Sequence, residues 1–295
     1  MTENTIEWSS PPDPGDRSME STVNDVPVHY VEHGSGTPIL ALHGGSVDHR
    51  EIAGWLEPLL RDRSGYRRIY PDLPGMGKTP APHTVNSSVD ILDILLGMID
   101  SIIGNEEFLV VGHSYGGYLA RSIANRRPDR LAGVALICPL IAMGESETRQ
   151  VPDHVVLHSS GNLSGILSAD DETEFRNYLV VQTPETLRRY QDVVAPGAAL
   201  ADQPALERIF ERWELRQTLE AAPAFMAPAL ILMGRQDSTV GYADQWRLIE
   251  HYPRATFAVL DRAGHALPHE QGGLLNALMG EWLDRVTEHR SGRSP

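Results

Sequence analysis

The stretch Phe-Leu-Val-Val-Gly-His-Ser-Tyr-Gly-Gly at residues 108–117 decides how this chain folds. Its apolar first half is typical of a buried strand, and a helical pattern over Tyr118–Arg126 follows it. Between the two, Gly112, Ser114 and Gly116 form a G-x-S-x-G motif. A sharp strand-to-helix turn lifts the serine Oγ clear of the sheet, and glycines beside it remove Cβ atoms that would clash. The stretch therefore predicts a candidate serine nucleophile at such a turn.

Short apolar runs alternate with helical patterns along most of the chain, which is typical of a mostly parallel sheet flanked by helices. The clearest helical stripe covers Val89–Ile103 and is followed by Gly104, where a C-terminal cap belongs. Two more helices are expected over 242–250 and 273–288. The strand-like runs are Val28–Glu32, Pro38–Leu42, Arg68–Tyr70, Phe108–Val111, Gly133–Cys138, Ala229–Met233 and Thr256–Leu260. We therefore predict an α/β fold with a mostly parallel twisted sheet.

One segment, from about Ile141 to Ala224, breaks this alternation. It carries three helical patterns, near 171–181, 184–194 and 204–219, and the last two begin with proline, which favours a helix start. Open α/β sheets bind ligands at the carboxyl ends of their strands, so we predict a helical lid over those ends. The first 20 residues are rich in Pro, Ser and acids and predict a flexible tail. The expected domains are a tail (1–20), a core (21–140 and 225–295) and a helical cap (141–224).

A serine nucleophile needs a general base, and the base needs an acid that orients it. Asp237 follows one strand-like run, and His265 follows the next. Asp261 and Glu270 are alternative acids, but Asp261 lies close before His265 at an expected strand end, so we favour Asp237. The order Ser114, Asp237, His265 is the nucleophile–acid–base order of one particular fold.

Together with Leu-His-Gly-Gly-Ser at residues 42–46, these motifs resemble those of the α/β-hydrolase family. The resemblance covers nearly the whole chain from about Met19, with a lid inserted after the sixth strand. It implies that the backbone amides of Gly45 and Tyr115 form an oxyanion hole. It also implies that the turn beginning at Asp72 is structural, and that the reaction needs no cofactor.

Several other polar residues lie near these motifs. His43 and His113 flank the site in sequence, and the resemblance assigns both positions to packing and loop hydrogen bonds. Asp48 and His49 follow the expected oxyanion loop, and both a substrate contact and a structural role stay open for them. We expect His269 at the surface or at a helix start.

The resemblance implies a capped serine hydrolase that cleaves a small carboxylic ester or lactone through an acyl-enzyme on Ser114. Serine at this position argues against relatives that use aspartate there, namely dehalogenases and epoxide hydrolases. An alternative is a proline iminopeptidase-like aminopeptidase, because Glu-Arg-Trp-Glu at 211–214 is reminiscent of that family's acidic lid. Ser46 stands where that family usually has proline. A further alternative is a non-catalytic, ligand-binding member of the fold, although such proteins usually lose a triad residue.

Substrate pockets are lined mainly by apolar and aromatic side chains. We expect Ser46 and five aromatic residues of the cap to contact the substrate: Phe175, Tyr178, Tyr190, Phe210 and Trp213. The alternative is that the aromatics only pack the cap against the core.

Composition excludes several other classes of function. The chain has 25 Lys and Arg against 40 Asp and Glu, a net charge of −15, which excludes a nucleic-acid surface. Its longest apolar stretch, 131–144, is too short to span a membrane and contains Pro139. Cys138 is the single cysteine, so an intramolecular disulfide is excluded. The histidines lack metal-site spacing, and we expect no metal. We expect a small-molecule substrate, no nucleic-acid or membrane partner, a monomer or homodimer, and a cytoplasmic location.

Overall fold

An eight-stranded sheet forms the centre of the computed structural model, which describes residues 17–61, 63–141, 150–161, 163, 165–215 and 223–292. The strand order is β1-β2-β4-β3-β5-β6-β9-β10, in which β1–β2 and β2–β4 are antiparallel and the other neighbours are parallel. The predicted α/β class with a mostly parallel sheet is confirmed. The strands are β1 (Arg17–Val23), β2 (Val26–Gly34), β3 (Thr37–Leu42), β4 (Tyr66–Pro71), β5 (Phe108–His113), β6 (Leu131–Ile137), β9 (Ala229–Gly234) and β10 (Ala255–Leu260).

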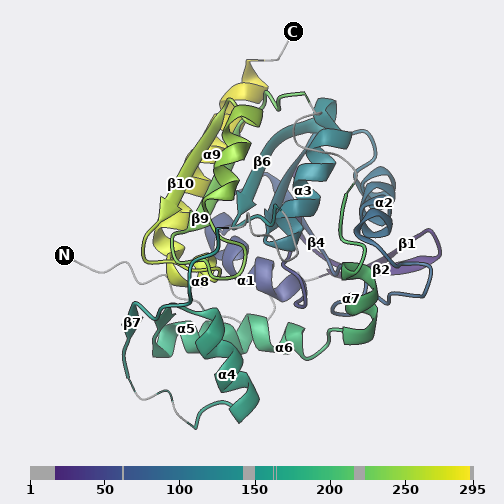
Figure 1. The fold of residues 1–295 in the computed structure, drawn as a ribbon. Helices are drawn as coiled ribbons and strands as arrows, with labels where there is room; N and C mark the ends of the chain where they lie inside the picture. The colour runs from purple at the N-terminus through teal and green to yellow at the C-terminus, as the bar shows by residue number, and fades with distance from the viewer. Residues whose placement is uncertain are drawn as a thin grey trace.

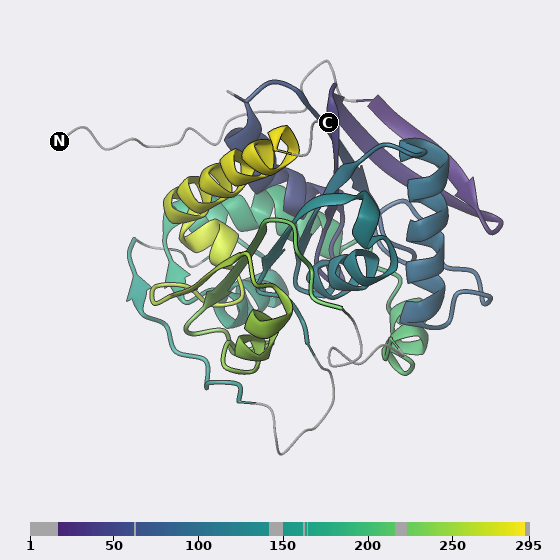
Figure 2. The same cartoon turned by 90° about the horizontal axis from the view of Figure 1, so that it is seen from above.

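Helices cover both faces of this sheet (Figures 1 and 2). On one face, α1 (His49–Leu60) and α9 (Gly272–Ser291) contact each other, and α2 (Ser88–Met98) and α3 (Tyr115–Arg126) do so on the other. A π-helical turn, Ile99–Ile103, extends α2, and Gly104 ends it with a φ of 63°. The left-handed φ is why a glycine stands there.

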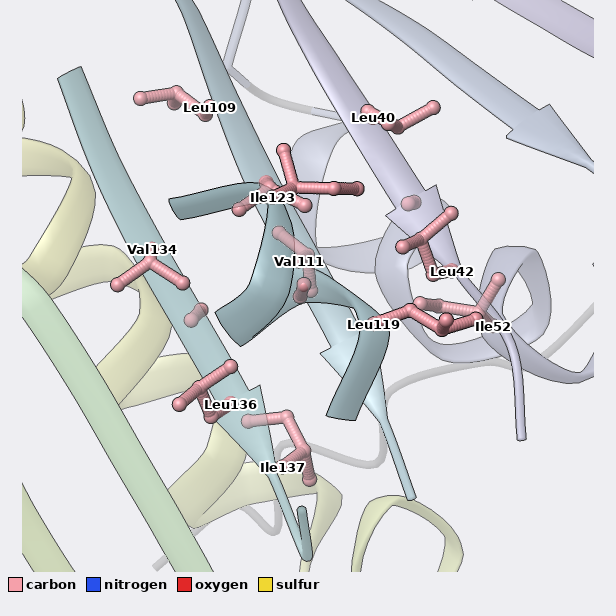
Figure 3. Packing of buried hydrophobic residues seen from close by; sticks show 14 of the residues in the cluster. Leu40, Leu42, Ile52, Leu109, Val111, Leu119, Ile123, Val134, Leu136 and Ile137 are labelled. Atoms are coloured by element: carbon pink, nitrogen blue, oxygen red, sulfur yellow. The ribbon is translucent and has the colours of Figure 1, made fainter. Parts of the chain in front are cut away.

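The hydrophobic core lies between the central strands and these helices. Every residue of β5 and β6 is buried, which explains why both read as continuous apolar runs rather than as an alternating pattern. Figure 3 shows strand side chains packed with side chains of α1 and α3: Leu40, Leu42, Ile52, Leu109, Val111, Leu119, Ile123, Val134, Leu136 and Ile137. This packing holds the carboxyl ends of β3, β5 and β9 in fixed relative positions.

The segment between β6 and β9 carries a separate group of helices beyond the carboxyl ends of the strands (Figure 1). Its helix α4 buries Phe175 in a small cluster with Leu163, Leu179, Leu187, Tyr190, Val194 and Ala266. Ala266 belongs to the loop after β10, so this cluster joins the inserted segment to the core. The elements are β7 (His158–Ser159), α4 (Ala169–Tyr178), β8 (Val181–Gln182), α5 (Pro184–Arg189), a π-helical turn (Tyr190–Val194), α6 (Ala195–Ala198) and α7 (Gln203–Phe210).

Four expectations need correction. The tail prediction is wrong for residues 17–20, because they belong to β1, which pairs antiparallel with β2; residues 1–16 lie outside the described residues. The inserted segment contains one short parallel strand pair, β7 with β8, where only helices were expected. Its last helix ends at Phe210 rather than near 219, and 216–222 are outside the described residues. The helix expected over 242–250 is a 3-10 helix, Asp244–His251.

Candidate active site

Ser114 occupies the turn between β5 and α3 with a φ of 53°, a left-handed value that residues with a Cβ rarely adopt. The glycines beside it allow the turn to be this tight. A Cβ on Gly112 would lie 2.3 Å from the carbonyl oxygen of Gly116, and a Cβ on Gly116 would lie 2.1 Å from that of Leu42. The motif therefore holds a strained, partly exposed serine in the turn between β5 and α3.

A continuous chain of hydrogen bonds runs from this serine to a buried carboxylate. Ser114 Oγ lies 2.8 Å from His265 Nε2, and His265 Nδ1 lies 2.8 Å from Asp237 Oδ2. The carboxylate accepts from Nδ1–H, which leaves Nε2 free to accept the serine proton. The three side chains come from the loops after β5, β9 and β10, so the order of the parallel strands brings them together.

Asp237 is fully buried, and its second oxygen is also satisfied. Oδ1 accepts hydrogen bonds from the Thr239 and Val240 amides, each at 2.9 Å. Burial alone would raise the pKa of Asp237, but His265 and these two amides outweigh burial and lower it. Asp237 is therefore an ionised partner for His265 at neutral pH.

The two alternative acids lie elsewhere. Asp261 is exposed and accepts a hydrogen bond from Gln236 Nε2 at 3.2 Å. Glu270 accepts from the Gly264 amide at 2.6 Å through one oxygen and from the Val180 and Val181 amides through the other. Its carboxylate ties the inserted segment to the loop that carries His265.

Gly45 and Tyr115, the predicted oxyanion-hole residues, are neighbours in space. A Cβ on Gly45 would lie 3.7 Å from the Tyr115 Cβ and 3.5 Å from the Phe210 ring. A Cβ on Gly44 would lie 3.5 Å from that of Ser114. The loop after β3 thus lies against the first turn of α3, beside the serine.

Three of the five cap aromatics contact residues of the core, and the other two pack within the inserted segment. Tyr178 lies edge-on to the His265 ring, with centroids 6.2 Å apart, and Phe210 meets the Tyr115 ring at 5.2 Å. Trp213 packs against the Tyr118 ring at 5.7 Å. The remaining two, Phe175 and Tyr190, are buried and meet edge to face inside the inserted segment, with ring centroids 5.6 Å apart. Tyr178 and Phe210 therefore contact residues of the candidate site, whereas Phe175 and Tyr190 form part of the inserted segment's own core.

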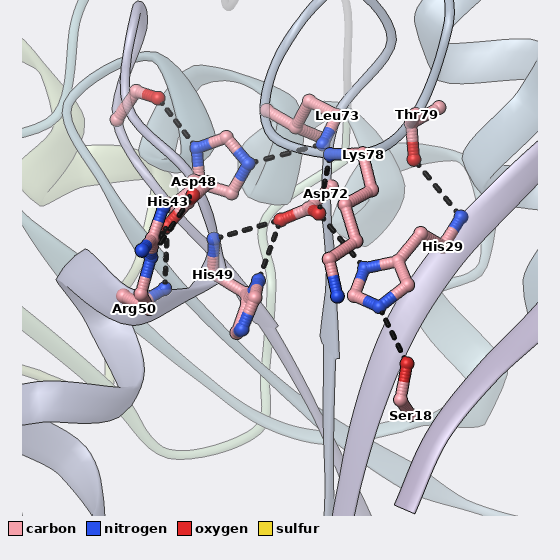
Figure 4. A network of polar contacts seen from close by, with 11 residues as sticks. Ser18, His29, His43, Asp48, His49, Arg50, Asp72, Leu73, Lys78 and Thr79 are labelled. Atoms are coloured by element: carbon pink, nitrogen blue, oxygen red, sulfur yellow. Dashed lines mark hydrogen bonds and ion pairs between the residues drawn. The ribbon is translucent and has the colours of Figure 1, made fainter. Parts of the chain in front are cut away.

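Asp72 organises the loop beside the site (Figure 4). Its buried carboxylate accepts from Nδ1 of His29 at 2.8 Å, from the amide and Nδ1 of His49 at 3.0 and 2.7 Å, and from the Lys78 amide at 2.8 Å. His43 Nε2 accepts from the Leu73 amide at 3.0 Å. The turn at Asp72 thus anchors the start of α1 and the loop before it.

Two residues whose role the sequence left open are part of this framework. Asp48 is buried and caps α1 by accepting from the Arg50 amide at 3.0 Å, and His49 is bound to Asp72. Ser46, the other predicted substrate contact in this loop, is partly exposed and has a φ of 61°. The contacts of Asp48 and His49 are structural.

A buried polar cluster behind the site had no clear signal in the sequence. Glu51 on α1 is 1% exposed and lies near His113 and His269, which are 2% and 1% exposed. Of the two expectations for His269, the surface position is wrong and the helix start is confirmed, because His269 lies in the first turn of a short helix, α8 (Leu267–Glu270). A glutamate in an amphipathic helix normally indicates the solvent face, so only the packing of α1 reveals this cluster.

Within the part of the chain that the structure describes, two groups of side chains have the residue types of a metal site: His113, Cys138 and His265, and His29, His49 and Asp72. In the first group, the triad histidine already uses both ring nitrogens in hydrogen bonds. In the second, the nitrogen–oxygen separations of 2.8 and 2.7 Å are those of hydrogen bonds. Ligands of a tetrahedral zinc ion stand farther apart, at about 3.3 Å. The second group therefore has the geometry of a hydrogen-bonded network, and in the first group both ring nitrogens of His265 are engaged by Ser114 and Asp237.

No helix among the described residues combines the length and apolar character needed to cross a membrane.

Comparisons with known proteins show the family to which this fold belongs. The family model described as "Alpha/beta hydrolase family" matches residues 39–278. An alpha/beta superfamily hydrolase from Oenococcus oeni is 31% identical, with a TM-score of 0.83 over 91% of this chain and 99% of that one. The 2-hydroxymuconate semialdehyde hydrolase of Pseudomonas sp. is 25% identical over 85% of this chain and 88% of its own length.

Other curated relatives match over shorter stretches. Lipase LipV of Mycobacterium tuberculosis is 33% identical over 43% of this chain, and the match spans 48% of LipV. Haloalkane dehalogenase 2 of the same species is 33% identical over 37% of each chain. The chain thus spans less than half the length of these relatives. The match to the family model covers most of the chain, and this protein therefore belongs to the alpha/beta hydrolase family.

Proposed function

We propose that this protein is a serine hydrolase that cleaves a small carboxylic ester or lactone through an acyl-enzyme on Ser114. The observation that carries the proposal is the unbroken hydrogen-bond chain from Ser114 through His265 to the ionised Asp237. A serine at this turn attacks an acyl carbon, whereas the aspartate of related dehalogenases and epoxide hydrolases attacks an alkyl carbon.

In the proposed reaction, Ser114 Oγ attacks the acyl carbon while His265 Nε2 takes its proton. The Gly45 and Tyr115 amides stabilise the oxyanion, each donor contributing about 3–4 kcal/mol. His265 then gives the proton to the leaving oxygen, and the acyl-enzyme forms. Water, activated by the same imidazole, hydrolyses that ester and releases the acid. Asp237 holds the imidazole tautomer and stabilises the imidazolium in both halves of the reaction.

The aromatic rings beside the candidate site favour an uncharged substrate. The inserted segment, residues 141–224, serves as the cap in this proposal and contributes aromatic rings, Tyr178 beside His265 and Phe210 beside Gly45. The aminopeptidase alternative needs acids that hold a substrate amine. Glu211 and Glu214 of its motif are instead exposed, which favours the ester or lactone.

A fluorophosphonate probe followed by peptide mass spectrometry tests the nucleophile. We expect one adduct, on Ser114, and no adduct in Ser114→Ala. Ser122→Ala is the matched control, because Ser122 lies on the same helix and donates to the Tyr118 carbonyl at 3.2 Å. An unlabelled folded protein would favour the non-catalytic, ligand-binding alternative.

A substrate panel then tests the bond that is cleaved. Short p-nitrophenyl esters and γ-lactones should turn over in wild type and not in Ser114→Ala. Hydrolysis of proline p-nitroanilide without ester hydrolysis would favour the aminopeptidase. Turnover of 2-hydroxymuconate semialdehyde alone would instead favour the substrate for which the Pseudomonas relative is named.

A further inference from the structure

A buried carboxylate behind the triad contacts the loops that the proposed reaction uses. Glu51 lies in the first turn of α1 and is 1% exposed. Its Oε1 lies 3.0 Å from His113 Nδ1, and its Oε2 accepts from the Gly44 amide at 3.4 Å. His113 precedes the nucleophile, and its Nε2 lies 3.1 Å from the carbonyl oxygen of His265. One carboxylate is therefore linked to the oxyanion loop, to the nucleophile turn and to the loop of the base.

The bonding rules fix where the protons of His113 lie. A carbonyl oxygen only accepts, so His113 Nε2 carries a hydrogen and donates it to His265. Nδ1 then faces a carboxylate oxygen at 3.0 Å, and that contact is attractive only if one of the two groups carries a proton there. Glu51 thus holds the proton arrangement that makes His113 a donor to the His265 backbone.

The third member of the cluster does not compete for this role. His269 Nε2 lies 3.9 Å from Glu51 Oε1, beyond hydrogen-bond distance. Burial lowers the pKa of His269 to about 4, so this imidazole is neutral. Burial would also lower the pKa of His113, but the Glu51 carboxylate and the His265 carbonyl raise it. The charge of Glu51 is therefore matched by His113.

We propose that Glu51 is a positioning residue that acts through His113 to hold the His265 loop, and through the Gly44 amide to hold the oxyanion loop, in register with Ser114. The inference deepens the proposed function and rests on it. Its consequence is kinetic, because His265 Nε2 must stay 2.8 Å from Ser114 Oγ, and a shift of about 1 Å costs about 100-fold in rate.

A purely structural role predicts a different outcome. Replacing both members of a buried ion pair with apolar groups of similar size is often neutral or stabilising. Removing only one member leaves the other charge buried and unpaired, which lowers stability. If Glu51 only fills space, Glu51→Leu should change Tm and leave kcat alone. If Glu51 positions the base, kcat should fall while KM changes little, because no contact to the substrate is removed.

The first experiment compares variants on one activated ester. We expect Glu51→Leu to lower kcat by about 10- to 100-fold with KM within about twofold. Glu51→Gln should recover most of kcat, because its amide group donates to His113 Nδ1 while its oxygen accepts from Gly44. Glu57→Leu is the matched control, because Glu57 also lies on α1 but pairs with Arg68 at 2.6 Å, away from the site. We expect this variant to have a lower Tm and the wild-type kcat.

A double variant tests whether the effect passes through His113. In a His113→Leu background, Glu51→Leu should lower kcat by a smaller factor than it does in wild type, because the part of its effect that passes through His113 is already lost. Additive losses in kcat would overturn the inference. So would a Glu51→Leu enzyme with wild-type kcat, or a Glu51→Gln enzyme as slow as Glu51→Leu.

Nitrogen-15 NMR of histidine-labelled wild type keeps the inference testable if Glu51→Leu does not fold. We expect His113 Nε2 to stay protonated between pH 6 and 8. A bare Nε2 would remove the donor to His265 and overturn the inference. This measurement is independent of fluorophosphonate labelling, so loss of labelling with a protonated Nε2 would contradict the proposed function alone.

Discussion

Replacing Asp237 with Asn should disable His265 as a base while leaving the fold nearly unchanged. The reason lies in the two amides that bind Asp237 Oδ1, from Thr239 and Val240 at 2.9 Å each. Both are donors, so an asparagine must turn its oxygen toward them. Its NH2 group then donates to His265 Nδ1, so the hydrogen of the neutral imidazole moves to Nε2. A protonated Nε2 cannot accept the serine proton.

The structure sets the size of this effect. An active tautomer requires the asparagine to flip and place its NH2 against the two amides, so the buried Val240 donor and the part-buried Thr239 donor both lose their acceptor. Each such donor costs about 1–3 kcal/mol, so the flip costs about 2–6 kcal/mol. Because about 1.4 kcal/mol corresponds to a factor of ten, the active population falls by about 30-fold to 10⁴-fold. We expect kcat to fall within that range.

The measurement is kcat on an activated ester together with Tm. Tm should fall by less than about 5 °C, because the two main-chain amides keep their partner. Asp261→Asn is the control and should keep wild-type kcat, because Asp261 is exposed and accepts its hydrogen bond from the side chain of Gln236 rather than from His265. The assignment of the acid would be refuted if Asp261→Asn lowered kcat strongly while Asp237→Asn kept more than a tenth of wild-type kcat.

Three further predictions compare matched pairs of variants. Ser114→Gly should be as inactive as Ser114→Ala but melt a few degrees higher, because glycine relieves a φ of 53° that costs about 1–3 kcal/mol in alanine; equal Tm values would argue against strain. Gly116→Ala should abolish activity and lower Tm because its Cβ would lie 2.1 Å from a main-chain oxygen, whereas Gly273→Ala, with open space around its Cβ, should be active and at least as stable. Phe210→Ala should change the ranking of esters by kcat/KM, whereas the buried Phe175→Ala should lose about 3–5 kcal/mol of stability and keep the ranking; identical rankings for both would assign Phe210 to packing.

The sequence by itself determined the features that depend on short stretches of chain. The apolar run of β5, the glycines around Ser114 and the helix after it specify the strand-to-helix turn through local sterics. The sequence also predicted that Asp237 and His265 each follow a strand, because a short apolar run comes before each of them. In a parallel sheet the carboxyl ends of neighbouring strands meet at one edge, so residues that follow separate strands come together.

Only the tertiary structure decided the features that depend on pairing between distant segments. Arg17–Val23 is a mostly polar and exposed stretch, and it is a strand because it pairs with the edge of β2. Glu51 reads as a solvent-facing residue of an amphipathic helix, yet the packing of α1 buries it against His113. Likewise, Phe210 and Phe175 have equal apolar character in the sequence. The path of the inserted segment places one beside Gly45 and the other inside its own core, because burial depends on which surfaces meet and not on residue type alone.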